Sequence, residues 1–158
     1  MRKLKQFAAL SWWQQGIFLE SWLRLGLMRA AVLTRPMKSL TRQLKHHEGP
    51  LVVKPASPEQ QRVASNVGKL VAAAAKYTPW DSPCLVQVLV VQRLMAKRQI
   101  PGQFYLGVRK GREFSDSGTD LSAHAWLQCG QMIVSGEAGH QLFTVVSAFS
   151  WEGRETPK

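Results

Sequence analysis

Cys84 and His124 are the two residues whose types and surroundings suit thiol chemistry. Cys84 follows Asp-Ser-Pro at 81–83 and opens an apolar run with helical spacing, whereas His124 lies in the Ser-Ala-His-Ala-Trp run 122–126, which is typical of a buried strand. The unpaired N–H groups and the dipole of a helix N-terminus favour a thiolate. An imidazole within hydrogen-bond reach can take the thiol proton. The pair therefore indicates a nucleophile and a general base, as in a cysteine hydrolase.

The other histidines and the second cysteine have weaker claims. His46 and His47 lie in a basic linker, and His140 follows a glycine in a polar turn. His124 is the one histidine inside an apolar strand, where a polar ring needs a partner. Cys129 lies at an expected turn and is an ordinary thiol. The alternative for the proposed pair itself is that Cys84 is a small core residue and His124 a satisfied core histidine.

A third group usually orients the histidine, and several residues could do so. Ser135 and Glu137 follow His124 along the chain on the next strand, and the loop carboxylate of Asp120 is a further candidate. We favour Glu137, because a carboxylate stabilises an imidazolium better than a hydroxyl does. No two of the cysteines and histidines stand at a familiar metal-ligand spacing, so neither a metal nor a cofactor is expected.

The elements before Cys84 are expected to be helical. Phe18, Trp22 and Leu25 have helical spacing, and a second, basic helix is expected over about 37–46 after Pro36. A linker covers 49–56. The strongest helix start is Ser57-Pro58-Glu59-Gln60, with Ser57 as N-cap and Gln60 completing a capping box. The buried face of that helix comprises Val63, Val67, Leu70, Val71 and Ala74.

The elements after Cys84 change from helical to strand period. The Cys84 helix, capped by Asp81 or Ser82, ends at 100–102. Strands follow at 104–108, 123–128 and 132–135, with a polar loop over 110–120 and a tight turn at 129–131. The predicted fold class is α+β, with the cysteine-bearing helix packed on a small antiparallel sheet. We assign 1–48 to a basic helical extension on the core, 49–56 to a linker and 57–158 to the core.

Composition limits the setting of the protein. A chain of 158 residues fits one domain, and two cysteines are too few for a disulfide scaffold, so we expect a reducing, cytoplasmic location. No secretory signal or membrane-spanning helix is predicted. The net charge is +11, of which +7 lies in residues 1–48. Such a surface attracts acidic partners, phosphates or anionic lipids.

Several short motifs resemble the transglutaminase-like leader peptidase of lasso-peptide biosynthesis, the leader-removing half of the B protein. They are Pro79-Trp80, Ser82-Pro83-Cys84-Leu85, Gln99-Ile100-Pro101, Leu106-Gly107-Val108, Ala123-His124-Ala125-Trp126-Leu127 and Gly130, with the segment 143–149 and, more loosely, the N-terminal helices. The resemblance covers most of the chain. The His-Ala-Trp part alone indicates only the wider transglutaminase-like superfamily.

The resemblance implies a cysteine peptidase that removes the leader from a ribosomally synthesised precursor. Cys84 would attack the scissile carbonyl, His124 would move the proton, and backbone N–H groups near Cys84 would hold the oxyanion. Members often carry an aspartate on the strand after the histidine, where this chain has Gly136 beside Ser135 and Glu137.

The resemblance also implies partners. Residues 1–48 show no strand alternation, so the winged-helix recognition domain found in fused members is not expected here. The expected partners are the precursor leader peptide, a separate leader-recognition protein and a lasso cyclase, with the basic N-terminal helices as a docking surface. A peripheral membrane contact for those helices stays open.

Two other functions fit the same residues. A transglutaminase-like amidase or acyl transferase would use the same thiol on another substrate. A non-enzymatic basic module would bury the thiol and bind nucleic acid through its basic helices. Nucleic-acid binding is not expected, because no nucleic-acid-binding motif is present.

Overall fold

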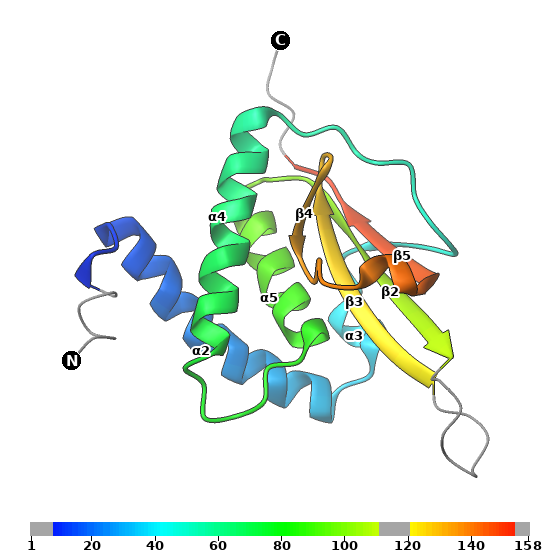
Figure 1. Ribbon diagram of the computed structural model, residues 1–158, viewed down its shortest axis with the longest axis horizontal. Helices are drawn as coiled ribbons and strands as arrows, with labels where there is room; N and C mark the ends of the chain where they lie inside the picture. The colour runs from blue at the N-terminus through cyan, green and yellow to red at the C-terminus, as the bar shows by residue number, and fades with distance from the viewer. Residues whose placement is uncertain (1–7, 111–120, 154–158) are drawn as a thin grey trace.

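The computed structural model describes residues 8–110 and 121–153, and it consists of a helical layer packed against one antiparallel sheet (Figure 1). The predicted α+β class is confirmed. Most of the predicted 110–120 loop, including Asp120, lies outside the described residues. The helices are α2 (Trp12–Thr34), α3 (Met37–Leu40), α4 (Pro58–Ala75) and α5 (Cys84–Lys97), with a 3-10 turn η1 (His140–Leu142).

The sheet has five strands in the order β1-β5-β2-β3-β4, and each neighbouring pair is antiparallel. The strands are β1 (Lys45–His47), β2 (Gly102–Lys110), β3 (Leu121–Cys129), β4 (Met132–Ser135) and β5 (Thr144–Trp151). The predicted strands at 104–108, 123–128 and 132–135 are β2, β3 and β4. The predicted turn between the last two is also present, with Gly130 at φ +56°.

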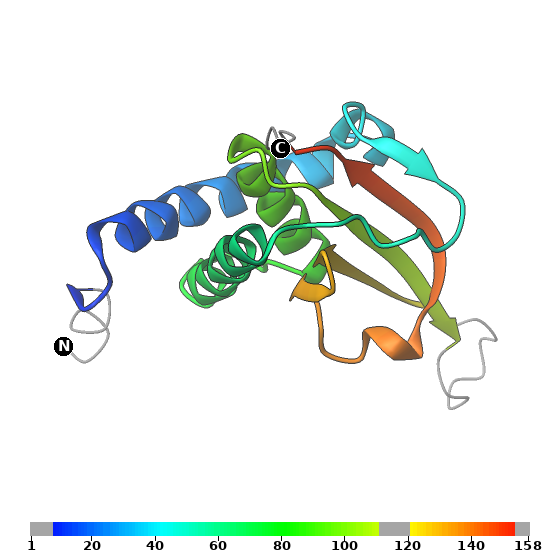
Figure 2. The ribbon, with the colours of Figure 1, turned by 90° about the horizontal axis from the view of Figure 1, so that it is seen from above.

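The two faces of the sheet carry different clusters. Phe104 and Leu127 point to the helical side, where they join the main core with Val71 and Leu89. The opposite face carries a smaller cluster of Tyr105, Trp126 and Ala148, against which Leu51, Ile133, Phe143 and Val145 pack. Figure 2 shows the helices on one side of the sheet and the segment between β4 and β5, including η1, on the other. The strand residues therefore alternate between two buried environments.

Helix α4 forms as its sequence predicts. The Ser57 hydroxyl accepts from the Gln60 N–H at 3.2 Å, and the Gln60 side chain accepts from the Ser57 N–H at 2.9 Å, which completes the capping box. Val67, Val71 and Ala74 on its apolar face are fully buried. The helix lies so close to β4 that a Cβ on Gly68 would come within 2.1 Å of the Val134 carbonyl oxygen.

The long helix α2 also contributes to the core. Ser11 and Gln14 form a second capping box at its start, and Ile17, Leu25 and Met28 are buried in the main cluster. Helix α2 is thus packed on the core. No described helix is long and apolar enough to cross a bilayer.

The predicted helix over about 37–46 is wrong beyond its first turn. Helix α3 ends at Leu40, and the chain then forms β1 at the edge of the sheet. His46 Nε2 lies 2.7 Å from the Ser147 hydroxyl and His47 Nε2 lies 3.1 Å from the Ser150 hydroxyl, so both histidines belong to a strand and not to a linker. The three residues of β1 carry no alternation of their own, and the strand forms because β5 offers a free edge.

Candidate active site

Cys84 is the first residue of α5. Its N-cap is Pro83, with extended backbone and no side-chain cap, so the predicted capping by Asp81 or Ser82 is wrong. The Ser82 hydroxyl instead lies 3.2 Å from the Thr78 hydroxyl. The Cys84 side chain is half-buried and packs against the main core cluster. The first turn of α5, which Cys84 opens, leaves backbone N–H groups free of intrahelical partners.

His124 lies on β3 with its ring held from several sides. The ring stacks on Trp126 at a centroid distance of 6.0 Å and packs against Phe143 at 5.1 Å. Its Nε2 lies 2.8 Å from the carbonyl oxygen of Gly136. A carbonyl can only accept, so Nε2 carries the proton and Nδ1 of the neutral ring is the unprotonated nitrogen. The ring is therefore fixed in the tautomer that leaves Nδ1 available as a base.

The hydrogen bond from His124 gives Gly136 a definite role. Gly136 has φ +74°, and a Cβ there would lie 2.2 Å from the Ala125 carbonyl oxygen. Only glycine brings its backbone this close to β3 without a clash. The group that orients the ring is thus a backbone carbonyl. Sequence reasoning missed it because a main-chain oxygen leaves no residue-type signal.

The side chain of Glu137 has no described contact with His124. The backbone carbonyl of Glu137 accepts a hydrogen bond from His140 Nδ1 at 2.7 Å. The exposed side chain of Glu137 borders a hollow between α4 and β4, which Gln61 and Lys69 also line. Ser135, the other candidate on this segment, lies in β4 opposite Leu127. The role of Glu137 as the third catalytic group stays a prediction.

In the described part of the chain, residues 8–110 and 121–153, no hydrogen bond connects Cys84 with His124. His124 shares a sheet face with Trp126, whereas Ala125 and Leu127 face the helical core against which Cys84 packs. Helix α5 and strand β3 begin toward the same end of the molecule in Figure 1. The two side chains therefore lie in different packing environments near one end of the sheet.

Cys129, the second thiol, is inert by position. It is fully buried in the main cluster, and burial raises its pKa to about 11. A thiol in this environment stays protonated at neutral pH and is a poor nucleophile. The described part of the chain also holds no group of three metal-ligating side chains.

A family model described as Transglutaminase-like superfamily matches residues 27–148, which is most of the chain. The chain belongs to the transglutaminase-like superfamily. Members of the superfamily are generally cysteine-protease-like enzymes. The matched span begins in α2, ends in β5 and includes both Cys84 and His124. Comparison with curated proteins and with solved structures gives no match.

Proposed function

We propose that this transglutaminase-like protein is a cysteine peptidase that removes the leader from a ribosomally synthesised lasso-peptide precursor. The observation that carries the proposal is the position of Cys84 at the first residue of α5, in a superfamily of thiol enzymes. The substrate class comes from the motifs around Cys84 and His124 noted in the sequence. A separate leader-recognition protein presents the leader, and a lasso cyclase uses the freed amine.

The proposed reaction assigns each group one task. The Cys84 sulfur attacks the scissile carbonyl, and free N–H groups in the first turn of α5 hold the developing oxyanion. His124 Nδ1 takes the thiol proton and gives it to the leaving amine, while Nε2 stays hydrogen-bonded to the Gly136 carbonyl. Water then attacks the Cys84 thioester, with His124 taking its proton, and the leader is released as a carboxylic acid with the thiol restored. Contacts of this kind often tighten only when substrate is bound. We therefore assign the contact between Cys84 and His124 to the complex with substrate and partner.

The different packing neighbours of the two side chains favour a second candidate, a non-catalytic member of the superfamily. In that case Cys84 is a core residue and His124 is a satisfied strand histidine. The two candidates differ in thiol reactivity. In the presence of the recognition protein and the leader peptide, a catalytic Cys84 reacts with iodoacetamide, and this reaction slows in His124→Ala. A structural Cys84 shows no such dependence on His124.

The decisive experiment is cleavage of a leader-bearing precursor in the presence of a recognition protein, followed by mass spectrometry. Wild type is expected to release the leader, and Cys84→Ala and His124→Ala are expected to release none. Cys129→Ala is the matched thiol control and His140→Ala the matched histidine control, and both should still cleave. Cleavage by Cys84→Ala would show that the nucleophile is wrong.

A further inference from the structure

A groove between α2, α3 and α5 lies apart from the proposed catalytic residues. It consists of two adjoining hollows of about 290 and 400 Å³, which share Arg24, Leu40 and Arg93. Arg93 is nine residues along α5 from Cys84, which is about 13 Å at the rise of an α-helix. We call this surface the α2–α5 groove. It can be altered without touching the proposed catalytic groups.

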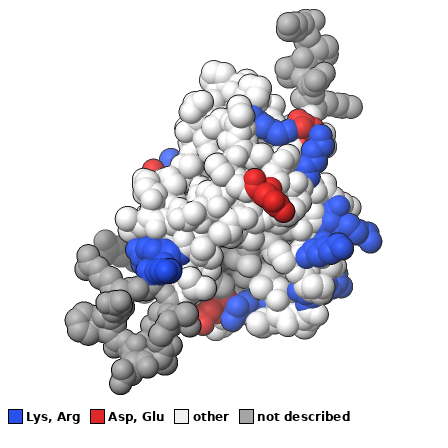
Figure 3. Space-filling model, turned by 90° about the vertical axis from the view of Figure 1, so that its right-hand side faces the viewer, with Lys and Arg blue, Asp and Glu red and all other residues white. Residues whose placement is uncertain are grey.

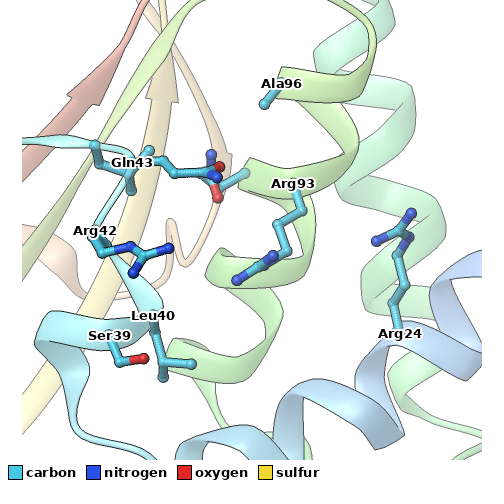
Figure 4. Close-up of a pocket in the computed structure, with 9 residues that line it drawn as sticks. Arg24, Ser39, Leu40, Arg42, Gln43, Arg93 and Ala96 are labelled. Carbon is cyan, nitrogen blue, oxygen red and sulfur yellow. The ribbon is translucent and has the colours of Figure 1, made fainter.

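One end of the α2–α5 groove is cationic and unneutralised. Figure 4 shows the guanidinium groups of Arg42 and Arg93 pointing toward one another across the hollow. Neither arginine has a hydrogen bond or an ion pair in the described part of the chain. Arg24 differs, because it pairs with Glu20, which Lys97 also contacts at 2.8 Å. A carboxylate between Arg42 and Arg93 would relieve their repulsion and accept charge-assisted hydrogen bonds from both.

The hollow also contains a buried amide. Gln92 lines it beside Arg93, and the residue as a whole is 7% exposed. Gln43 and Ser39 supply further polar groups at the rim. A carboxylate bound between the two arginines can also accept a hydrogen bond from the Gln92 amide. This end of the groove is thus suited to a polar, acidic group.

The surface of α2 beside the second hollow is apolar. Leu19, Leu23 and Leu27 of α2 are 59, 58 and 64% exposed. They are spaced i, i+4, i+8 and so form one stripe along the helix. Leu27 itself lines the second hollow with Met28 and Arg35, so the stripe ends at the hollow that adjoins the cationic one. Exposed leucines in a row are typical of a surface that another chain covers.

We propose that the α2–α5 groove binds an amphipathic acidic segment of a partner protein. The apolar residues of the segment pack on Leu23 and Leu27, and its carboxylates bind Arg42 and Arg93. The arginines line a hollow, which a protruding peptide fills better than the plane of a bilayer does. The face of the molecule in Figure 3 carries more basic than acidic side chains, in line with the net charge of +11, and a positive net charge attracts acidic partners. The proposal does not depend on peptidase activity.

Phage display of random peptides on the full-length protein tests this occupant. The enriched peptides are expected to carry leucine-like residues at helical spacing and a cluster of Asp or Glu. A synthetic peptide from the selection should bind in fluorescence anisotropy, and replacing its acidic residues with Gln or Asn should weaken binding about tenfold or more. Enrichment of peptides without acidic residues, or no enrichment at all, would overturn the proposal.

Variants locate the site on the protein. Arg42→Glu with Arg93→Glu should weaken the selected peptide about tenfold or more, and Leu23→Ser with Leu27→Ser should do the same. The control is Lys69→Glu with Lys76→Glu on α4, which makes the same change of net charge and should alter binding less than about twofold. Circular dichroism verifies that each variant is folded. Equal weakening by the control would mean unspecific attraction and would end the proposal.

Vesicles containing phosphatidylserine distinguish the lipid alternative. The wild type is expected to sediment with them no more than Arg42→Glu with Arg93→Glu does. If those two arginines instead control vesicle binding and leave the selected peptide unaffected, the groove is a lipid contact and the peptide proposal is wrong.

Discussion

Replacement of Gly136 by alanine tests the link between β4 and the His124 ring. With φ at +74°, a Cβ at this position costs about 1–2 kcal/mol in backbone strain. The same Cβ would lie 2.2 Å from the Ala125 carbonyl oxygen and 2.8 Å from the Cα of Trp126, which adds about 1–3 kcal/mol of overpacking. Gly136→Ala should therefore lower the free energy of unfolding by about 2–5 kcal/mol.

Gly139 provides a matched control for this prediction. It has the same φ of +74°, but the nearest atom to a Cβ there is Leu142 Cδ1 at 3.9 Å. Gly139→Ala should lose only the backbone contribution of about 1–2 kcal/mol. Urea unfolding of both variants and the wild type gives the comparison, provided that the m-values agree. Equal losses in the two variants would refute the close approach of Gly136 to β3.

The His124 ring gives a second measurement on the same variants. In the wild type the Gly136 carbonyl holds the proton on Nε2, so nitrogen NMR of the imidazole should show one dominant tautomer near neutral pH. Gly136→Ala should displace the carbonyl and mix the two tautomers, whereas Gly139→Ala should leave the signals in place. A wild-type ring protonated mainly on Nδ1 would contradict the assigned hydrogen bond.

Two more predictions concern packing and pH. Gly68→Ala should lower the melting temperature, because its Cβ would meet the Val134 carbonyl and the overpacking of about 1–3 kcal/mol exceeds the gain in helix propensity. Gly16→Ala is the control: a Cβ on this residue of α2 has no atom within 4 Å, so the substitution should stabilise the protein by up to about 1 kcal/mol. Stabilisation by both substitutions would reject the close contact of α4 with β4. Burial raises the pKa of Cys129 from 9.0 to about 11, so the folded thiol keeps a proton that the unfolded thiol loses. Its contribution to stability is full below pH 9 and declines as pH rises toward about 11, and urea midpoints across that range should fall less in Cys129→Ala than in wild type.

Sequence patterns predicted the elements whose determinants are local. The start of α4 depends on Ser57, Pro58 and Gln60, which lie next to one another, and β2 and β3 have the period of two that a sheet requires. The three-residue β1 was missed because its partner strand, β5, is at the far end of the chain. The cap of α5 was missed because Ser82 bonds to the preceding turn instead of the helix.

Whether His124 faces Cys84 depends on which face of the sheet carries the His124 side chain, and the residue types in β3 do not determine that face. Strand residues alternate, so His124 shares its face with Trp126 and opposes Ala125 and Leu127. The pair Ala125 and Leu127 and the pair His124 and Trp126 are both apolar enough to be buried. The sequence alone does not show which pair contacts the helices. The ring stacking on Trp126 could have been anticipated from the i, i+2 spacing alone.

The position of β5 between β1 and β2 has a consequence for biosynthesis. During translation, helices α2 to α5 and strands β1 to β4 are synthesised before residues 144–151, which form β5. Until then β2 presents one bare edge and β1 has nothing to pair with, and such edges promote association with other nascent chains. The sheet is thus completed late in translation, when β5 pairs with β1 on one side and with β2 on the other.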